Sequence, residues 1–221
     1  MSVKRIPLAT GEFYHVYNKS IADENIFDNL NYLNKILDNT EYYRFNQRIK
    51  LSRFNSLPRS LQEDYLKQIK KFQPLIEIYA FSFMPNHFHF LLKQLQEGGI
   101  LRFISNIQNS YAKYFDLKND RKGSLFLSSF KYRRIISEEL FIHVCRYVHL
   151  NHVTSHLIEF GQLATYPFSS YSWYLNKDLN RFVNGDLITN HFKTKTNFIK
   201  FHLNQVDYQR KFKEIKDLLL E

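Results

Sequence analysis

His87 and His89 are two residues apart, and imidazole nitrogens are common ligands of divalent cations. Successive side chains of a β-strand point to opposite faces, so on a strand these two rings would project together. On a helix the same spacing would turn them roughly half a turn apart. The apolar residues around the pair favour a strand. The spacing therefore predicts a two-histidine grip on a divalent metal; two unrelated histidines on a half-buried strand are the alternative interpretation.

A second group of chemically useful side chains lies farther along the chain, on a predicted helix. His143, Tyr147 and Asn151 follow one another at intervals of four residues, which places them on one helix face. A tyrosine hydroxyl can act as a nucleophile, and an amide oxygen can complete a metal site. In the alternative interpretation Tyr147 is a core aromatic residue and Asn151 a helix cap or a surface group. Cys145 is the single cysteine, so the chain itself can form neither a disulfide nor a cysteine-based zinc site.

The elements that would position these residues follow from hydrophobic periodicity and turn residues. We expect strands over 12–18, 75–83, 87–94 and 125–136, and helices over 25–39, 100–116 and 137–157. The first six of these elements fit an α+β fold, a ferredoxin-like β-α-β-β-α-β sandwich whose antiparallel sheet is covered by helices on one face. The seventh is an additional C-terminal helix, which would be the catalytic one because it carries Tyr147.

The predicted domain spans residues 1–175, with a helical insertion near residues 40–73. Residues 176–221 are polar and basic, and we expect a separate helical tail that ends in a charged helix over 206–220. The absence of an 18-residue apolar run argues against a membrane span. Residues 1–10 also lack the apolar stretch of a signal peptide, so we expect a soluble, cytoplasmic protein.

The chain is basic, with 31 Lys and Arg against 21 Asp and Glu and a net charge of +10. A basic globular protein attracts polyanions, because each neutralised phosphate releases counterions. Several basic side chains flank the motifs above and are expected to follow a DNA backbone: Lys113, Arg121, Lys122, Lys131, Arg133, Arg134 and Arg146. A solvated basic surface is the alternative.

Several segments, taken in order, resemble the IS200-like (Y1, HUH-type) tyrosine transposases, most closely their REP-associated branch. They are 14–19, 80–92, 111–116, 122–126, 146–153 and 166–171. The second of them contains Met84, Pro85, Asn86 and both histidines. Together they cover roughly residues 12–175. The chain departs from the family pattern at His152, where a proline is usual.

The resemblance implies a chemistry and a site. His87 and His89 would bind a divalent metal, Mg²⁺ or Mn²⁺, and Asn151 would complete the metal site. Tyr147 would be the nucleophile that cleaves and rejoins single-stranded or hairpin DNA through a 5′-phosphotyrosine bond, without a nucleotide cofactor. Histidine ligands suit Mn²⁺ at least as well as Mg²⁺, which prefers oxygen. In this topology His15, on the first strand, could lie beside the metal strand and support it.

Two alternatives remain at this point. The chain could be a catalytically inactive or host-retained protein that binds DNA hairpins, or a metal-dependent hydrolase that uses water in place of Tyr147. Branches of the family differ in whether they dimerise, so a homodimer is left open.

Overall fold

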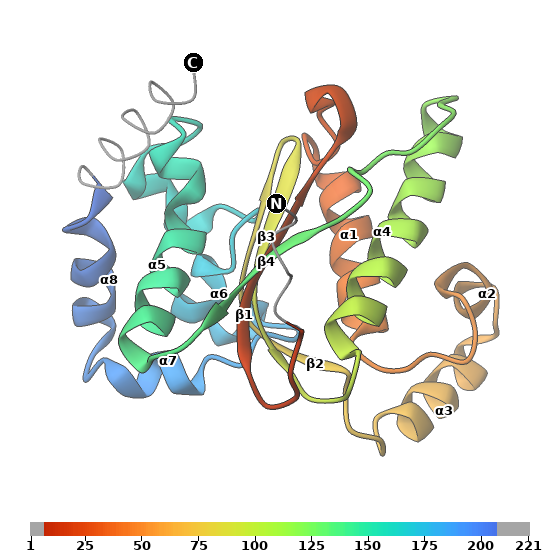
Figure 1. Cartoon of the computed structure of the whole chain (residues 1–221), viewed down its shortest axis with the longest axis horizontal. Coiled ribbons are helices and arrows are strands. Elements are labelled where there is room, and N and C mark those ends of the chain that lie inside the picture. The colour runs from red at the N-terminus through yellow and green to blue at the C-terminus, as the bar shows by residue number, and fades with distance from the viewer. Residues whose placement is uncertain (1–6, 207–221) are drawn as a thin grey trace.

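The computed structural model describes residues 7–206, and its centre is one antiparallel sheet (Figure 1). Its strands are β1 (Phe13–Lys19), β2 (Ile76–Met84), β3 (His87–Gln94) and β4 (Lys131–Ile135), in the order β2-β3-β1-β4. This order confirms the ferredoxin-like β-α-β-β-α-β arrangement. The last predicted strand was too long: residues 125–130 lie outside β4. They are joined to the β1 side by an isolated bridge between Ser20 and Phe126 and by a hydrogen bond from Asn18 Nδ2 to Leu127 O.

One face of the sheet is covered by α1 (Leu30–Tyr43) and α4 (Gly99–Lys118), which pack against each other. Asn29 caps α1 by accepting a hydrogen bond from the Tyr32 backbone. Residues that alternate along β1 and β3, such as Val16, Phe88 and Phe90, are fully buried on this face. It forms an apolar core of the ordinary kind.

The two helices of the β-α-β-β-α-β unit thus cover one face as expected, and the additional C-terminal helix covers the other. This second face carries α5 (Glu138–Thr154), and three short helices follow it in the chain: α6 (Tyr171–Leu175), which packs against β2, α7 (Asp186–His191) and α8 (Lys195–Leu203) (Figure 1). Ser137 caps α5 by accepting from the Leu140 backbone, and Glu138 and Glu139 lie in its first turn. Both features stabilise a helix that starts there.

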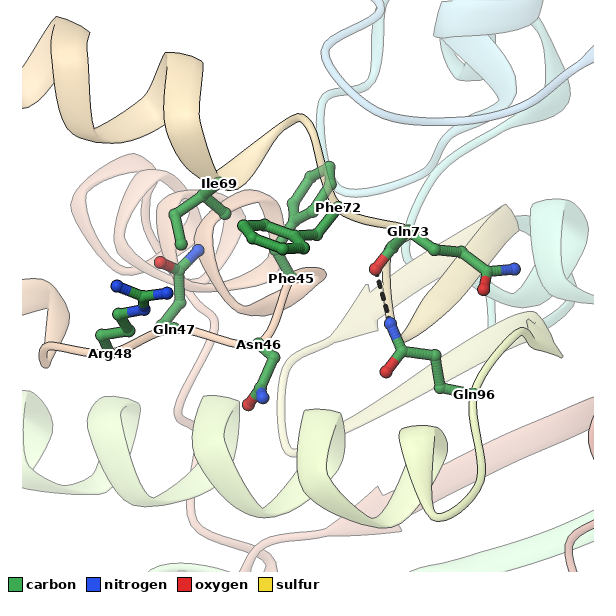
Figure 2. Close-up of a pocket in the computed structure, with 8 residues that line it drawn as sticks. All are labelled: Phe45, Asn46, Gln47, Arg48, Ile69, Phe72, Gln73 and Gln96. Carbon is green, nitrogen blue, oxygen red and sulfur yellow. Dashed lines mark hydrogen bonds between the residues drawn. The ribbon is translucent and has the colours of Figure 1, made fainter.

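The insertion after α1 is helical, with α2 (Leu51–Asn55) and α3 (Arg59–Ile69). A pocket of about 200 Å³ lies beside it (Figure 2), and its lining residues are Phe45, Asn46, Gln47, Arg48, Ile69, Phe72, Gln73 and Gln96. Gln73 precedes β2 and Gln96 follows β3. The pocket is therefore at the end of the sheet opposite to the β2–β3 turn.

The described part of the expected tail belongs to the same core. The short 3-10 helices η1 (Ile21–Asp23), η2 (Phe160–Thr165) and η3 (Lys177–Leu179) complete the secondary structure of residues 7–206. Beyond residue 175, Phe182, Val183 and Phe198 are buried in the main cluster, and the Asn184 backbone donates to Ile78 O at 2.8 Å. The core thus continues across residue 175. The charged helix expected over 206–220 falls, apart from Val206, outside the described residues. Within residues 7–206 no helix is both long and apolar enough to cross a bilayer.

Candidate active site

Both histidines of the predicted pair lie on β3 and face α5. His87 and His89 are opposite Lys19 and Tyr17 of β1, and their ring centroids are 5.0 Å apart with the rings nearly perpendicular at 79°. His89 is buried, with 7% of its surface exposed, and His87 is partly buried. The strand geometry inferred from the spacing is therefore present.

Tyr147 projects from α5 onto these rings. Its ring meets His89 edge-on at 5.8 Å and His15 edge-on at 5.7 Å. The Tyr147 side chain is 40% exposed, so it also has access to solvent. The structure thus brings together a candidate nucleophile and a candidate metal ligand that are far apart in the sequence.

His15 lies directly beside His89. Its Nε2 is 2.9 Å from His89 Nδ1, and the two rings stack with centroids 5.1 Å apart. Burial, with the Arg133 charge as a smaller cause, lowers the pKa of His15 to about 4, so the ring is neutral near pH 7. The sequence-based suggestion that His15 lies beside the strand that carries the histidine pair is confirmed.

Tyr17 is a member of the site that the sequence analysis missed. Its ring stacks on His89 with centroids 5.5 Å apart at 25°. Burial, and to a lesser extent Tyr17, raises the pKa of Tyr147. A tyrosine with a raised pKa is protonated near neutral pH and needs help to become a nucleophile. The signal that could have found Tyr17 was its position two residues after His15 on one strand.

The two histidines fit a metal site in one respect. His87 Nδ1 is 2.6 Å from Asn86 Oδ1, and His89 Nδ1 is engaged by His15. A ligand histidine typically donates its second ring N–H to a neighbouring group, which directs the other nitrogen at the cation. Both rings would therefore present Nε2.

The two histidines have few candidate partners that could complete a metal-ligand set. Within residues 7–206 there is no group of three or more His, Cys, Asp or Glu side chains suited to holding a metal. Asn151 is buried on α5, and its Nδ2 finds no hydrogen-bond partner among the described residues. Rotation of the amide would turn that end into an oxygen acceptor suited to a cation. The contacts of the described residues do not join Asn151 to either histidine.

The other histidines of α5 have structural partners. His152 Nε2 is 3.0 Å from Phe83 O, and burial lowers the His152 pKa to about 4, so a neutral ring tethers α5 to β2 where the transposase pattern has proline. His149 is buried, 3.0 Å from Ser170 Oγ and from His202 Nε2. His143 does not join the Tyr147 cluster; its Nδ1 is 2.7 Å from an Arg146 nitrogen.

The expected DNA-binding residues separate into distinct groups. Lys131 and Arg133 are exposed on the site face of β4, opposite Tyr17 and His15. Arg134 projects from the other face and pairs with Glu12. Lys113 and Lys122 are exposed on α4 and in the following loop.

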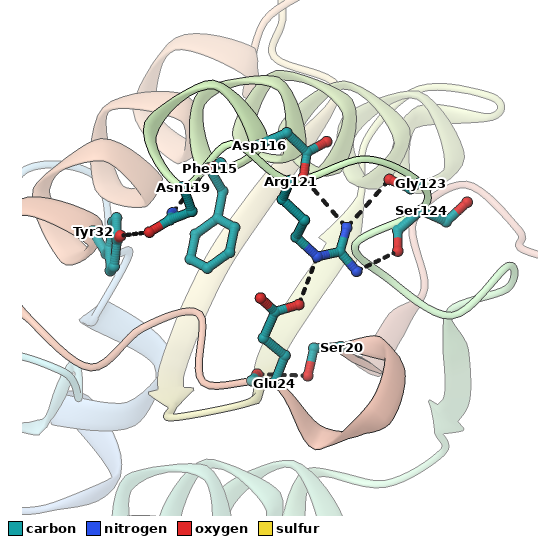
Figure 3. A network of polar contacts seen from close by, with 9 residues as sticks. All are labelled: Ser20, Glu24, Tyr32, Phe115, Asp116, Asn119, Arg121, Gly123 and Ser124. Carbon is teal, nitrogen blue, oxygen red and sulfur yellow. Dashed lines mark hydrogen bonds and ion pairs between the residues drawn. The ribbon is translucent and has the colours of Figure 1, made fainter.

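Two further arginines of the set, besides Arg134, are engaged within the chain. Arg121 binds Glu24, Asp116 and two loop carbonyls (Figure 3). Arg146 is buried, stacks on Phe201 of α8 at 4.1 Å and donates to its carbonyl oxygen. Lys131 and Arg133 are therefore the members of the set best placed to meet a phosphate beside Tyr147.

Comparison with known proteins identifies a related fold. No family model and no curated protein sequence matches the chain. Among solved structures, a REP-associated tyrosine transposase bound to a REP hairpin matches with a TM-score of 0.55 and 16% identity, over 82% of this chain and 89% of that one. The chain has the fold of a tyrosine transposase. At this identity the likeness establishes the fold alone.

Proposed function

We propose that this chain is a metal-assisted DNA-nicking and strand-transfer enzyme of the IS200-like transposase type, in its REP-associated branch, which acts on single-stranded or hairpin DNA. The observation that carries the proposal is the meeting of Tyr147, from α5, with His15 and His89, from two adjacent strands. The solved structure that shares the fold is bound to a DNA hairpin, which supports a DNA partner.

His87 and His89 would hold the divalent cation, Mn²⁺ or Mg²⁺, and Asn151 would add an amide ligand from α5. When bound, the cation supplies Lewis-acid stabilisation of the charge on the scissile phosphate. Neutral His15 supports His89 without adding a second positive charge next to it. These roles use the donor atoms that the chain itself brings to this face.

Tyr147 would make the covalent link. Its hydroxyl loses its proton as the oxygen forms a bond to phosphorus, the bond from phosphorus to the 3′ oxygen breaks, and that oxygen takes one proton and leaves as a 3′-hydroxyl, so that protons balance. The product is a 5′-phosphotyrosine; this polarity is taken from the transposase resemblance. Because the covalent bond retains the phosphodiester energy, a 3′-hydroxyl can reverse the step and join strands without ATP.

Lys131 and Arg133 would hold the backbone on either side of the scissile phosphate. Both are exposed on the edge strand β4, beside the strand that carries His15 and Tyr17. Phosphate contacts of this kind position a strand without reading its sequence. The edge of β4 therefore forms a path for DNA that leads to Tyr147.

The test is a covalent-adduct assay with Mn²⁺ and hairpin oligonucleotides labelled at the 3′ end, since a 5′-phosphotyrosine retains that label. Wild type should form a labelled protein band and Tyr147→Phe should form none. Tyr114→Phe, on α4 across the sheet, is the matched control and should keep the adduct. The double variant His87→Ala with His89→Ala should lower metal-dependent cleavage by more than about 100-fold, the scale seen when one group that stabilises developing charge is removed.

Each alternative gives a different result. Cleavage that persists in Tyr147→Phe without any adduct would indicate a hydrolase that uses water. Hairpin binding with neither cleavage nor adduct in the wild type would indicate an inactive binding protein.

A further inference from the structure

The turn between β2 and β3, directly before His87, is held by the segment that follows β1. The backbone N–H of Ser20 donates to Asn86 O at 2.8 Å. Those of Ile26 and Phe27 both donate to Pro85 O, at 2.7 and 3.0 Å. Both turn carbonyls are thus bonded to residues 20–27. These hydrogen bonds fix the position of the turn backbone from which the Asn86 side chain extends.

The Asn86 side chain lies between an acid and His87. Its Nδ2 donates to Asp23 Oδ1 at 2.8 Å, and its Oδ1 is 2.6 Å from His87 Nδ1. A carboxylate only accepts hydrogen bonds, so Asp23 decides which end of the amide is the nitrogen. The amide oxygen also only accepts, so His87 Nδ1 must carry the proton. The lone pair of the imidazole is then on Nε2.

We propose that Asp23 and Asn86 are positioning residues that hold His87 in the Nδ1–H tautomer and so present its Nε2 to a divalent cation. This inference rests on the proposed function, because it assigns a support to the metal site of that function. It concerns two residues outside the histidine pair and outside α5.

The conformation of Asp23 is itself braced. Ala22 and Asp23 have φ values of 54° and 57°, in the left-handed region that is costly for residues other than glycine. Next to them, Glu24 binds the Arg121 guanidinium at 2.7 Å, and its carbonyl accepts from Ser20 Oγ at 2.7 Å (Figure 3). Lys19 also pairs with the Asp23 carboxylate. The loop after α4 thus holds a strained turn in the position from which Asp23 reaches Asn86.

This role also accounts for Arg121, which was expected to contact DNA. Its guanidinium has Glu24 and Asp116 as ion-pair partners and the carbonyls of Gly123 and Ser124 as acceptors. It therefore joins the loop after α4 to the segment that carries Asp23.

His89 provides the contrast within the same pair. Its Nδ1 faces His15, whose imidazole can either donate or accept, so that contact does not dictate one tautomer. The contact of His87 with Asn86 does dictate one. We therefore expect His87 to be ordered for metal binding before the cation arrives.

The experiment reads the tautomer directly in the metal-free protein. Two-bond ¹H–¹⁵N spectra of the histidine-labelled full chain at pH 7.5, with His87 assigned through His87→Gln, should show wild-type His87 protonated on Nδ1. In Asn86→Ala, which removes the acceptor, His87 should become a mixture of tautomers. Asp23→Ala should give a smaller change in the same direction. Asp23→Asn keeps an oxygen acceptor, so its spectrum should match that of wild type.

Mn²⁺ titration supplies the second measurement. Loss of an outer partner of a ligand histidine typically weakens metal binding 10–100-fold, so we expect about that loss in Asn86→Ala. The matched control is Asp64→Ala. Asp64 is an exposed aspartate of α3, paired with Lys67 and outside both the turn and the loop after α4, so neither the His87 tautomer nor the Mn²⁺ affinity of this variant should differ from wild type.

The outcomes separate this inference from the proposed function. Wild-type His87 protonated on Nε2 overturns the inference without using any variant, and so does an Asn86→Ala protein with unchanged tautomer and Mn²⁺ affinity. If the tautomer is as expected but Tyr147 forms no DNA adduct, the proposed function fails and the positioning role stands.

Discussion

The two faces of the sheet are built from the same strands but differ in chemistry. On the α1–α4 face, β3 contributes Phe88 and Phe90, which contact other aromatic rings and are fully buried. On the α5 face, the same strand contributes His87 and His89. Alternation along a strand thus lets eight residues serve a core and a site together.

The α5 face is itself divided along its length. At the end away from the β2–β3 turn, Phe13, Tyr79 and Phe141 pack ring against ring. At the turn end, histidines and tyrosines take their place, and Tyr147 is partly exposed. The aromatic end anchors α5, and the polar end is where reactive groups can reach both solvent and one another. The predictions below test this division between a stabilising face and a functional one.

The largest effect on stability is expected on the α1–α4 face. Phe90→Ala should lower the free energy of unfolding by about 3–5 kcal/mol, since it leaves a cavity in a packed apolar layer. Tyr147→Phe, on the α5 face, should change it by only about 0.5 kcal/mol, as for other partly exposed side chains. Urea unfolding of both variants measures the difference. Equal losses in the two variants would remove the distinction between the faces.

Acid should weaken the α5 face first. Burial lowers the pKa of His202, on α8, to about 3, with its neighbour His149 also held neutral. Protonation of such a group favours the unfolded chain, so its contribution to stability is present above about pH 6.5 and is lost as the pH falls towards about 3. Between about pH 6.5 and pH 3, the slope of the free energy of unfolding against pH should therefore be smaller in His202→Gln than in wild type, by up to about 1.4 kcal/mol per pH unit. Urea unfolding at a series of pH values measures this slope.

Hydrogen exchange can assign that acid effect to one layer. Neither α1 nor α4 contains a histidine, so their amides should keep their protection down to a pH at which α8 and α5 have begun to open. Simultaneous loss of protection on both faces would show that the two layers unfold as one unit.

The smallest effect expected is on DNA binding. Replacing Lys131 and Arg133 with alanine should reduce the slope of log affinity against log salt by about 1.4 for a single strand, about 0.7 for each phosphate that the protein no longer neutralises. Arg134→Ala is the matched control, because this residue is on the same strand but the opposite face and is paired with Glu12. Fluorescence anisotropy over a salt series measures both. A slope reduced as much by Arg134→Ala would place the DNA path on the other face or along the edge itself.

Local features of the fold were predictable from the sequence, because they depend on periods of two and of three to four residues. The His87–His89 strand, the turn at Pro85 and Asn86, and the cap at Ser137 are all of this kind. The order of elements then restricted the topology to few choices. The start of β4 was missed because residues 125–130 have strand-like composition, yet only an isolated bridge at Phe126 pairs them.

The sequence by itself determined that His87 and His89 share a face and that Tyr147 and Asn151 lie on one helix, since neighbours along the chain fix those relations. Only the tertiary structure decided that Tyr147 meets the histidines, that His15 and Tyr17 join them, and that Arg121 braces a turn. Those contacts join residues far apart in sequence, and strand pairing and helix docking bring them together. For that reason, knowing that a residue is basic or aromatic was not enough to predict which distant residue its side chain contacts.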